Sequence, residues 1–376
     1  MSFQTANPNR LPFRRLLIVT GSLHGGGSEK QVYYIAKAAQ MLGLRSAVVT
    51  LQENGIWQRR IEEDLGQRVR VLPQGPRWWR LIQLARLARS FRAEMVHTVH
   101  FYAGAYMTMA KLFRRMPVIV SLRTSHELLH RRTRWFERAL NFYGADAVVS
   151  NSWAVIHALR KRTFIPIPLY YLPNAIAISG PPVQPVWRRG EPFRLIFIGN
   201  ISHGKNASLL LKVVRELHRE GYPIRGMIAG KGQMLGAVID EAERLGVSDF
   251  VEFHGHVSDV YSLLRQAHAF FFPSLNEGMP NAVMEAVAAG IPVVSSRVGD
   301  VPRLIEDGKS GLLFERNNVM EAFEKTRWLI DRYDALMPVF TREALSRLKA
   351  HHAFEQFPHR LKALYLRIYN RYHGIR

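Results

Sequence analysis

The chain has 376 residues, of which 47% are hydrophobic and 11% aromatic, and it contains no cysteine. The lack of cysteine excludes a disulfide framework, a zinc–cysteine site and cysteine catalysis, and the length predicts two domains, because single hydrophobic cores stop growing below this size. The formal net charge is +22, and nearly all of the excess lies in residues 1–190, which carry 28 lysine and arginine residues but 9 acidic ones. Such a one-sided basic field attracts a polyanion, although a solvated arginine-rich surface is an alternative.

The first predicted element in chain order is a strand at 15–20, followed by a loop with Gly25, Gly26 and Gly27 and then by a helical pattern to Leu42. This order is the opening of a βαβ unit. Three adjacent glycines let the backbone approach a phosphate or an acceptor closely, although a simple strand-to-helix turn is an equal alternative. Further strands, with helices between them, are predicted at 46–51, 69–72, 95–98, 117–122, 145–150 and 168–172.

Proline and glycine are concentrated at 179–192, which we interpret as the linker between two domains. A second series of strands separated by helices is predicted at 193–198, 225–229, 251–254, 269–273 and 292–296. The alternation indicates parallel sheets, so the predicted fold class is α/β, with two Rossmann-like, doubly wound domains facing a central cleft. The expected domains are 1–185, 186–350 and a helical segment at 351–376 that packs back on the first domain.

The most informative segment is 270–296. An apolar strand ends there, a loop carries Glu277, and a helix that begins near Pro280 carries Glu285. A helix N-terminus presents N–H groups and a positive dipole to a phosphate, and proline suits the first turn. Carboxylates accept hydrogen bonds from the paired hydroxyls of a sugar or a ribose. The alternative is that both acids only stabilise the helix dipole.

Seven residues separate Glu277 from Glu285, and the run Ala288–Val294 follows; in this pattern the chain resembles the retaining glycosyltransferase family 4 (group 1), which has the GT-B fold. The resemblance implies that Glu277 contacts the transferred sugar and that Glu285 holds the ribose of a nucleotide-sugar donor. It implies neither a cofactor nor a bound metal. It places the sugar and the β-phosphate against Gly278, Met279, Pro280 and Asn281.

Other donor-side segments are similar to the family as well. Lys205 stands where the family has a lysine that neutralises the donor diphosphate, whereas Asn200 replaces an expected arginine. Gly230 and Lys231 match a glycine turn, and Lys231 would supply the charge that Asn200 lacks, although a surface lysine is an equal alternative. The loop that usually lines the pocket for the base carries His256 and Val257.

The acceptor side matches the family less completely, because Arg123 stands where many members have a histidine. His100 or His126 would serve in its place, or Arg123 would hold an acceptor diphosphate through two hydrogen bonds. Retaining transfer in this family is viewed as a front-face reaction, so cations at the diphosphate carry catalysis. The catalytic candidates are therefore Glu277, Lys205, His100 and Arg123, and the candidate acceptor or phosphate loop comprises Gly25, Gly26, Gly27 and His126.

The predicted helix at 77–92 combines arginine with Trp78 and Trp79, as interfacial membrane helices do, although burial of its apolar arc between strands is the alternative. A second basic run lies at 129–138. The N-terminal residues lack the apolar core of a secretion signal. We therefore expect a cytoplasmic protein that is peripheral at the inner membrane face, with its first domain on anionic lipid. The expected reaction moves a hexose or N-acetylhexosamine, with UDP favoured, to a lipid-linked or cell-surface-polysaccharide acceptor.

Three alternatives stay open from the sequence. The first is a transferase of the same fold that acts on a soluble acceptor. The second is a P-loop nucleotide hydrolase, since Gly199–Asn206 differs from the phosphate-loop signature by Asn206 in place of the magnesium-binding hydroxyl. The third is nucleic-acid binding, which is not expected, because the basic charge comes without a recognisable reading module.

Overall fold

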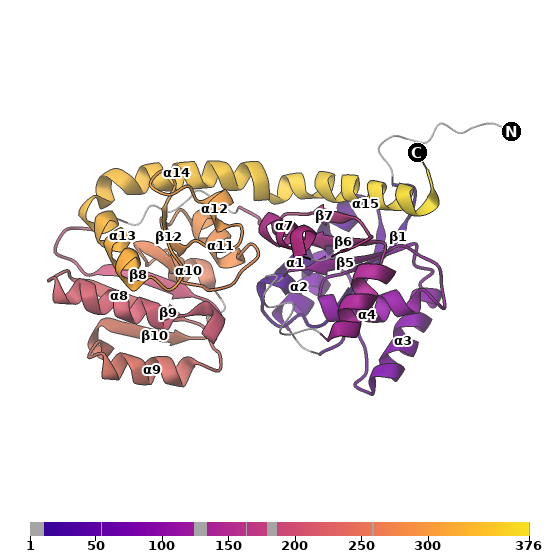
Figure 1. The fold of residues 1–376 in the computed structure, drawn as a ribbon, viewed down its shortest axis with the longest axis horizontal. Coiled ribbons are helices and arrows are strands. Elements are labelled where there is room, and N and C mark those ends of the chain that lie inside the picture. The colour runs from indigo at the N-terminus through magenta and orange to yellow at the C-terminus, as the bar shows by residue number, and fades with distance from the viewer. Residues whose placement is uncertain are drawn as a thin grey trace. The chain divides into compact units, whose positions relative to one another are not determined.

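The computed structural model divides the chain into two compact units (Figure 1). Unit 1 comprises Met1–Ala175 and Phe354–Arg376, and unit 2 comprises Ile176–Ala353. The residues that the structure describes are 11–53, 55–123, 134–162, 164–178, 186–257 and 259–375.

Unit 1 is built on a seven-stranded parallel sheet with the order β3-β2-β1-β4-β5-β6-β7. Ile18, at its centre, pairs with Val48 on one side and with His97 on the other. Leu16, Leu17, Ile18 and Val19 are all fully buried, as expected for a parallel strand covered on both faces. The strands are β1 (Arg15–Thr20), β2 (Arg45–Thr50), β3 (Arg70–Val71), β4 (Met95–Thr98), β5 (Val118–Leu122), β6 (Ala147–Ser150) and β7 (Leu169–Tyr171).

The helices of unit 1 cover both faces of this sheet. Helix α1 packs against α2 and α15, whereas α4 packs against α3, α6 and η1. Their bounds are α1 (Gly27–Met41), α2 (Ile56–Leu65), α3 (Arg77–Ser90), α4 (Phe101–Ala110), α6 (Trp135–Ala139), the π-helical turn η1 (Leu140–Gly144), α7 (Trp153–Arg162), the 3-10 turn η4 (Phe354–Gln356) and α15 (Phe357–His373).

The last helix, α15, completes the core of unit 1 (Figure 1, yellow beside the indigo and magenta elements). Tyr365 is fully buried, and its hydroxyl lies 2.8 Å from Nδ1 of His97 on β4. Phe13 contacts the ring of Tyr365 edge-on and stacks on that of Tyr369, with centroid distances of 6.0 and 5.5 Å. The C-terminal segment is therefore part of unit 1, although all of unit 2 precedes it in the chain.

Unit 2 is built on a six-stranded parallel sheet with the order β10-β9-β8-β11-β12-β13. Successive residues of β11 face opposite sides: Phe271 belongs to one buried cluster, and Phe270 and Phe272 belong to the other. The strands are β8 (Phe193–Ile198), β9 (Ile224–Ala229), β10 (Val251–Gly255), β11 (Ala269–Phe272), β12 (Val293–Ser296) and β13 (Leu312–Phe314).

Helices also pack on both faces of this second sheet. Helix α8 buries leucine and valine side chains in one cluster, and α11 buries Val283, Met284 and Val287 in the other. The helices are η2 (His203–Lys205), α8 (Ser208–Arg219), α9 (Leu235–Arg244), η3 (Ser248–Phe250), α10 (Val260–Leu264), α11 (Asn281–Ala289), α12 (Val301–Leu304), α13 (Val319–Asp331) and α14 (Tyr333–His352). Two Rossmann-like parallel sheets in one chain match the predicted α/β class.

The division between the units lies earlier than the expected boundary at 185/186. Ile176 is 1% exposed and belongs to a buried cluster of unit 2, against which Ile178 also packs. The N–H of Ile176 donates to the carbonyl of His352 at 2.9 Å. These contacts assign 176–178 to unit 2, whereas the sequence placed them in the first domain. The first half of the expected linker, 179–185, lies outside the described residues.

Among the described helices, none is both long enough and apolar enough to cross a bilayer.

Candidate functional site

Lys205 and Glu277 meet at the carboxyl ends of two neighbouring strands, β8 and β11. Nζ of Lys205 lies 2.5 Å from Oε1 of Glu277, and both side chains are mostly buried, at 26% and 14% exposed. The ammonium group also lies 5.1 Å from the ring centroid of Phe272, the last residue of β11. The structure therefore joins the two strongest catalytic candidates in one ion pair.

Ser274 connects this ion pair to the backbone around it. Its hydroxyl lies 2.9 Å from Oε1 of Glu277 and 3.0 Å from the carbonyl oxygen of Gly204. The hydroxyl of Ser296, at the end of β12, donates to the carbonyl of Ser274 at 2.5 Å. Sequence reasoning missed Ser274; the available signal was a polar residue just after a strand and three positions before Glu277.

The loop after Glu277 leads directly into α11. The helix begins at Asn281 after Pro280, whose own side chain makes no capping hydrogen bond. Glu285 lies in its second turn and is partly exposed, whereas Gly278, Met279 and Pro280 are buried. The helix ends at Gly290, which has the left-handed conformation (φ 81°) common at helix C-termini.

The segment after β12 contacts this loop through its backbone. The N–H of Asp300 donates to the carbonyl of Gly278 at 2.8 Å. Gly299 has φ +52°, and a Cβ placed there would lie 2.1 Å from that same carbonyl oxygen. Only glycine fits this approach, so the position of Gly278 depends on a close backbone contact.

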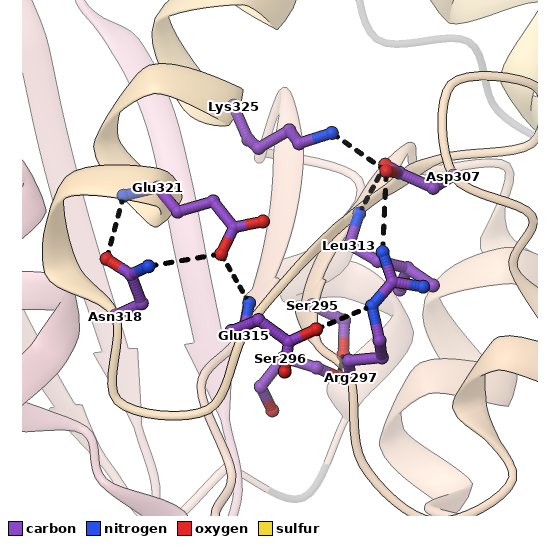
Figure 2. A network of polar contacts seen from close by, with 9 residues as sticks. All are labelled: Ser295, Ser296, Arg297, Asp307, Leu313, Glu315, Asn318, Glu321 and Lys325. Atoms are coloured by element: carbon purple, nitrogen blue, oxygen red, sulfur yellow. Dashed lines mark hydrogen bonds and ion pairs between the residues drawn. The ribbon is translucent and has the colours of Figure 1, made fainter.

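An ionic network holds the start of that supporting segment (Figure 2). The guanidinium of Arg297 lies 3.0 Å from Glu315 and 3.5 Å from Asp307, and Lys325 binds the same oxygen of Asp307 at 2.8 Å. Asp307 also accepts the N–H of Leu313 at 2.9 Å through its second oxygen. Several pairs that share partners hold a backbone segment better than isolated surface pairs do. A further set of hydrogen bonds in this view joins Glu315, Asn318 and Glu321.

The loops after β8, β9 and β10 lie against one another. Gly230 donates its N–H to the carbonyl of Gly255 at 2.6 Å, and its φ of +146° brings its Cα so close to Gly199 that a Cβ would lie 1.8 Å from that carbonyl. A Cβ on Gly232 would lie 2.6 Å from Oδ1 of Asn200. Asn200 and Gly230 are therefore brought together. The side chains that extend from these loops are those of Asn200, Lys231 and His256, which are exposed, and Val257, which is partly buried.

In unit 1, His100 lies at the carboxyl end of β4 beside the end of β1. Its Nδ1 accepts the N–H of Gly21 at 3.0 Å and lies 2.8 Å from Oγ1 of Thr20. Nδ1 is thus the acceptor nitrogen, so the neutral ring carries its proton on Nε2, 3.8 Å from Glu29. Burial lowers the pKa of His100, and nearby Arg123 lowers it further while Glu29 opposes them. The ring is therefore arranged to donate a hydrogen bond through Nε2.

Glu29 lies in the first turn of α1, two residues after the glycines. The sequence placed it in the same loop motif but gave it no role. Glu29 accepts a hydrogen bond from the hydroxyl of Ser22 at 2.8 Å and faces Nε2 of His100. Of the glycines in the loop, Gly26 precedes α1 and Gly27 begins it. Gly25 has open space where a side chain would be.

Arg123 follows β5 and is fixed by Asn174. Its Nη1 donates to Oδ1 of Asn174 at 2.6 Å, whereas its buried Nε has no hydrogen-bond partner. Burial lowers the pKa of Arg123 to about 10, a change that Tyr365 partly opposes. The group therefore stays charged at neutral pH. His126, the remaining candidate, lies outside the described residues.

Within the described parts of the chain, no group of three or more histidine, aspartate and glutamate side chains is arranged to hold a metal ion.

Comparison with known proteins gives matches over nearly the whole chain. The family described as Glycosyltransferase Family 4 matches residues 25–179, and the family described as Glycosyl transferases group 1 matches residues 184–342.

Individual relatives match more locally. The chain is 31% identical over 183 residues to an Escherichia coli protein, WcaL, named for glycosyl transfer in colanic acid biosynthesis; the match spans 46% of this chain and 44% of that protein. It is 28% identical over 177 residues to a component of the phosphatidylinositol N-acetylglucosaminyltransferase of Arabidopsis thaliana, across 45% and 39% of the two chains. The chain thus spans less than half the length of these curated relatives.

Among solved structures, HepE of Anabaena in complex with UDP-glucose has the same fold. The TM-score is 0.81 with 16% sequence identity, and the match covers 94% of this chain and 99% of HepE.

Proposed function

Because the chain belongs to glycosyltransferase family 4, we propose that it transfers a sugar from a nucleotide-sugar donor to an acceptor, with the donor on unit 2 and the acceptor on unit 1. The observation that carries this proposal is the Lys205–Glu277 ion pair beside the start of α11. A cation, a carboxylate and a helix N-terminus at one strand edge suit a sugar diphosphate.

Each group has a distinct part in the proposed reaction. The bond from the anomeric carbon to the phosphate oxygen breaks, and a bond to the acceptor oxygen forms on the same face of the sugar. Because the new bond forms on the face from which the phosphate leaves, the configuration is retained, and the leaving phosphate takes the proton from the acceptor hydroxyl. Lys205 and the dipole of α11 stabilise the charge that develops on the diphosphate, while Glu277 accepts hydrogen bonds from the sugar.

The remaining donor contacts follow from the neighbouring loops. Glu285 would bind the ribose hydroxyls, and Gly278, Met279, Pro280 and Asn281 would surround the sugar and the β-phosphate. Since Asn200 brings no charge, the exposed Lys231 would add the second cation. The base would lie beside Gly230, His256 and Val257.

On unit 1, His100 and Arg123 would face the acceptor. Nε2 of His100 would donate a hydrogen bond to the acceptor, and the charged guanidinium of Arg123 would attract an acceptor phosphate. The glycine loop of Gly25, Gly26 and Gly27 would allow the acceptor to approach the backbone.

The preferred donor is a UDP-linked hexose or N-acetylhexosamine, and the preferred acceptor is a lipid-linked or cell-surface glycan at the inner membrane face. The donor is supported by HepE with UDP-glucose and by the N-acetylglucosaminyltransferase. The acceptor is supported by the colanic acid and phosphatidylinositol relatives and by the basic charge of residues 1–190.

Two glutamate variants test the proposal. Glu285→Ala should raise the Kd of UDP about tenfold, the effect of losing one charged hydrogen-bonding group, whereas Glu277→Ala should lower kcat about a hundredfold with little change in that Kd. Binding is read by the thermal shift that UDP produces, and turnover by release of UDP from UDP-sugars.

The matched control is Glu324→Ala on α13, which removes an exposed glutamate of the same unit. It should behave like the wild type in both measurements. Wild-type activity and binding in both Glu277→Ala and Glu285→Ala would refute the assignment.

A further inference from the structure

Helix α4 has no charged residue between Phe101 and Ala110, yet one side of it is exposed. A helix that is apolar all round is normally buried. Here Tyr102, Met109 and Phe113 are 38%, 36% and 62% exposed, and Leu112 beside them is 85% exposed. The spacing of three to four residues between Tyr102, Tyr106 and Met109 places them on one stripe of α4, with Tyr106 partly buried. Leu112 and Phe113 lie in the turn that follows the helix.

The neighbours of α4 extend this exposed apolar surface. Helix α4 packs against α3, α6 and η1. The contact with η1 is close, because Nζ of Lys111 donates to the carbonyl of Gly144 at 3.0 Å. The adjoining elements contribute Trp135 of α6, which is 74% exposed, and Tyr143 of η1. We call this surface the α4 face: Tyr102, Met109, Leu112, Phe113, Trp135 and Tyr143.

The charges around the α4 face are mainly positive. Arg114 and Arg115 follow Phe113, and Arg134 precedes Trp135. The nearby carboxylates are engaged: Asp146 pairs with Lys111 at 2.8 Å, and Glu137 accepts the N–H of Arg134 at 3.3 Å. The α4 face therefore consists of exposed apolar side chains flanked by arginine residues.

This combination fits an anionic lipid bilayer better than other polyanions. Tryptophan and tyrosine favour the membrane–water interface, leucine and phenylalanine enter the acyl boundary, and arginine reaches the headgroups from an apolar stem. A nucleic acid would use the charge but not the exposed Leu112 and Met109. The helix at 77–92, the candidate from sequence, is less suitable, because Leu84, Ala85 and Ala88 of its apolar arc are buried.

We propose that the α4 face is the surface through which the protein docks on an anionic membrane. The inference rests on the proposed function, because it explains how a lipid-linked acceptor would reach the site. The stripe begins at Tyr102, whose ring centroid lies 5.8 Å from that of His100. A bilayer along α4 brings its headgroups to the end of the sheet where His100 lies.

The test is co-sedimentation of the full chain with vesicles made of equal parts phosphatidylglycerol and phosphatidylcholine. The wild type should bind them, more weakly as salt rises, and should bind pure phosphatidylcholine vesicles poorly. The double variant Leu112→Ser/Phe113→Ser should bind about tenfold less, since it removes two exposed apolar groups. Met41→Ser is the matched control; Met41 is 62% exposed and ends α1, which packs with α2 and α15.

Three outcomes would overturn the inference: a wild type that ignores the anionic vesicles, equal binding by the double variant, or a lipid-free dimer that the double variant converts to monomer. In the last case the α4 face is an interface between two copies. UDP binding and UDP release on a water-soluble acceptor analogue, measured on the same variants, separate the two proposals. They should stay at wild-type level when only docking is lost, and their absence in the wild type would instead refute the proposed transferase.

Discussion

At the scale of residues, the site depends on how Glu277 is held. Its Oε1 receives both the Lys205 ammonium group and the Ser274 hydroxyl, at 2.5 and 2.9 Å. The hydrogen bond from Ser274 would hold the Glu277 carboxylate in place even when the Lys205 ammonium group moves to bind a diphosphate. Ser274 is thus a positioning residue in the proposed reaction.

We therefore expect Ser274→Ala to lower kcat several-fold, roughly what one neutral hydrogen bond of about 1 kcal/mol supplies, and to leave the Kd of UDP unchanged. Ser274→Thr keeps the hydroxyl and should recover part of the loss. Ser295→Ala is the control, since its buried hydroxyl contacts the carbonyls of Phe272 and Ser296. A parallel rise in the Kd of UDP would show that Ser274 binds the donor and does not act through Glu277.

The sequence identified Lys205 and Glu277 because each stands in a local motif at the end of a predicted strand, and parallel strands end at one edge of a sheet. It missed Ser274 because single polar residues after a strand are common in turns, and it named Glu29 within the glycine-loop motif without giving it a role. Their roles come from partners that the fold supplies, such as the ring of His100, 71 positions beyond Glu29.

At the scale of elements, α15 is joined to β4 by one buried hydrogen bond. The hydroxyl of Tyr365 meets Nδ1 of His97, whose Nε2 lies 2.9 Å from the hydroxyl of Ser121. Alternation of strands and helices predicted every strand of the first sheet and five of the six in the second, because apolar runs and their spacing are local. The short edge strand β13 was not predicted. The pairing of His97 with Tyr365 joins residues 268 positions apart and has no local signal.

Tyr365→Phe should lower the free energy of unfolding of unit 1 by about 1–3 kcal/mol, because Nδ1 of His97 stays buried without its partner. Denaturant titration measures the change in the free energy of unfolding, and hydrogen exchange of the β4 amides shows whether the loss is located in unit 1. Tyr372→Phe, on the same helix but only partly buried, is the control and should leave stability unchanged. Equal stability of wild type and Tyr365→Phe would mean that the hydrogen bond contributes nothing net.

His97 also makes unit 1 sensitive to acid. Burial, with a smaller contribution from Arg123, lowers the pKa of His97 to about 3, well below its ordinary value of about 6.5. Between about pH 6.5 and pH 3, the His97 imidazole is therefore protonated in the unfolded chain but neutral in the folded chain. The free energy of unfolding that is present above about pH 6.5 is lost progressively as the pH falls toward 3. The expected slope is on the order of 1 kcal/mol per pH unit, and His97→Gln should reduce it. The measurement is the free energy of unfolding of the wild type and of His97→Gln at several pH values between 3 and 6.5. An equal dependence on pH in the two proteins would contradict the prediction.

At the scale of the whole molecule, the chain passes between its units twice, after Ala175 and after Ala353. Ile176 forms a parallel bridge with Ala353, so the two passages lie side by side. The sequence placed the first passage about ten residues later, because proline and glycine are dense at 179–192. The boundary is set instead by Ile176, which is buried in unit 2, and by Ile178, which packs against the same cluster. Two isolated apolar residues do not change the local composition enough to mark a domain boundary.

The discontinuity of unit 1 has a consequence for how the protein is made. Unit 2 is one uninterrupted stretch, whereas the buried hydrogen bond between His97 of β4 and Tyr365 can form only after that entire stretch has been synthesised. During translation, unit 2 can therefore fold before unit 1 is complete. Unit 1, with the apolar α4 among its elements, lacks its last helix until α15 has been synthesised.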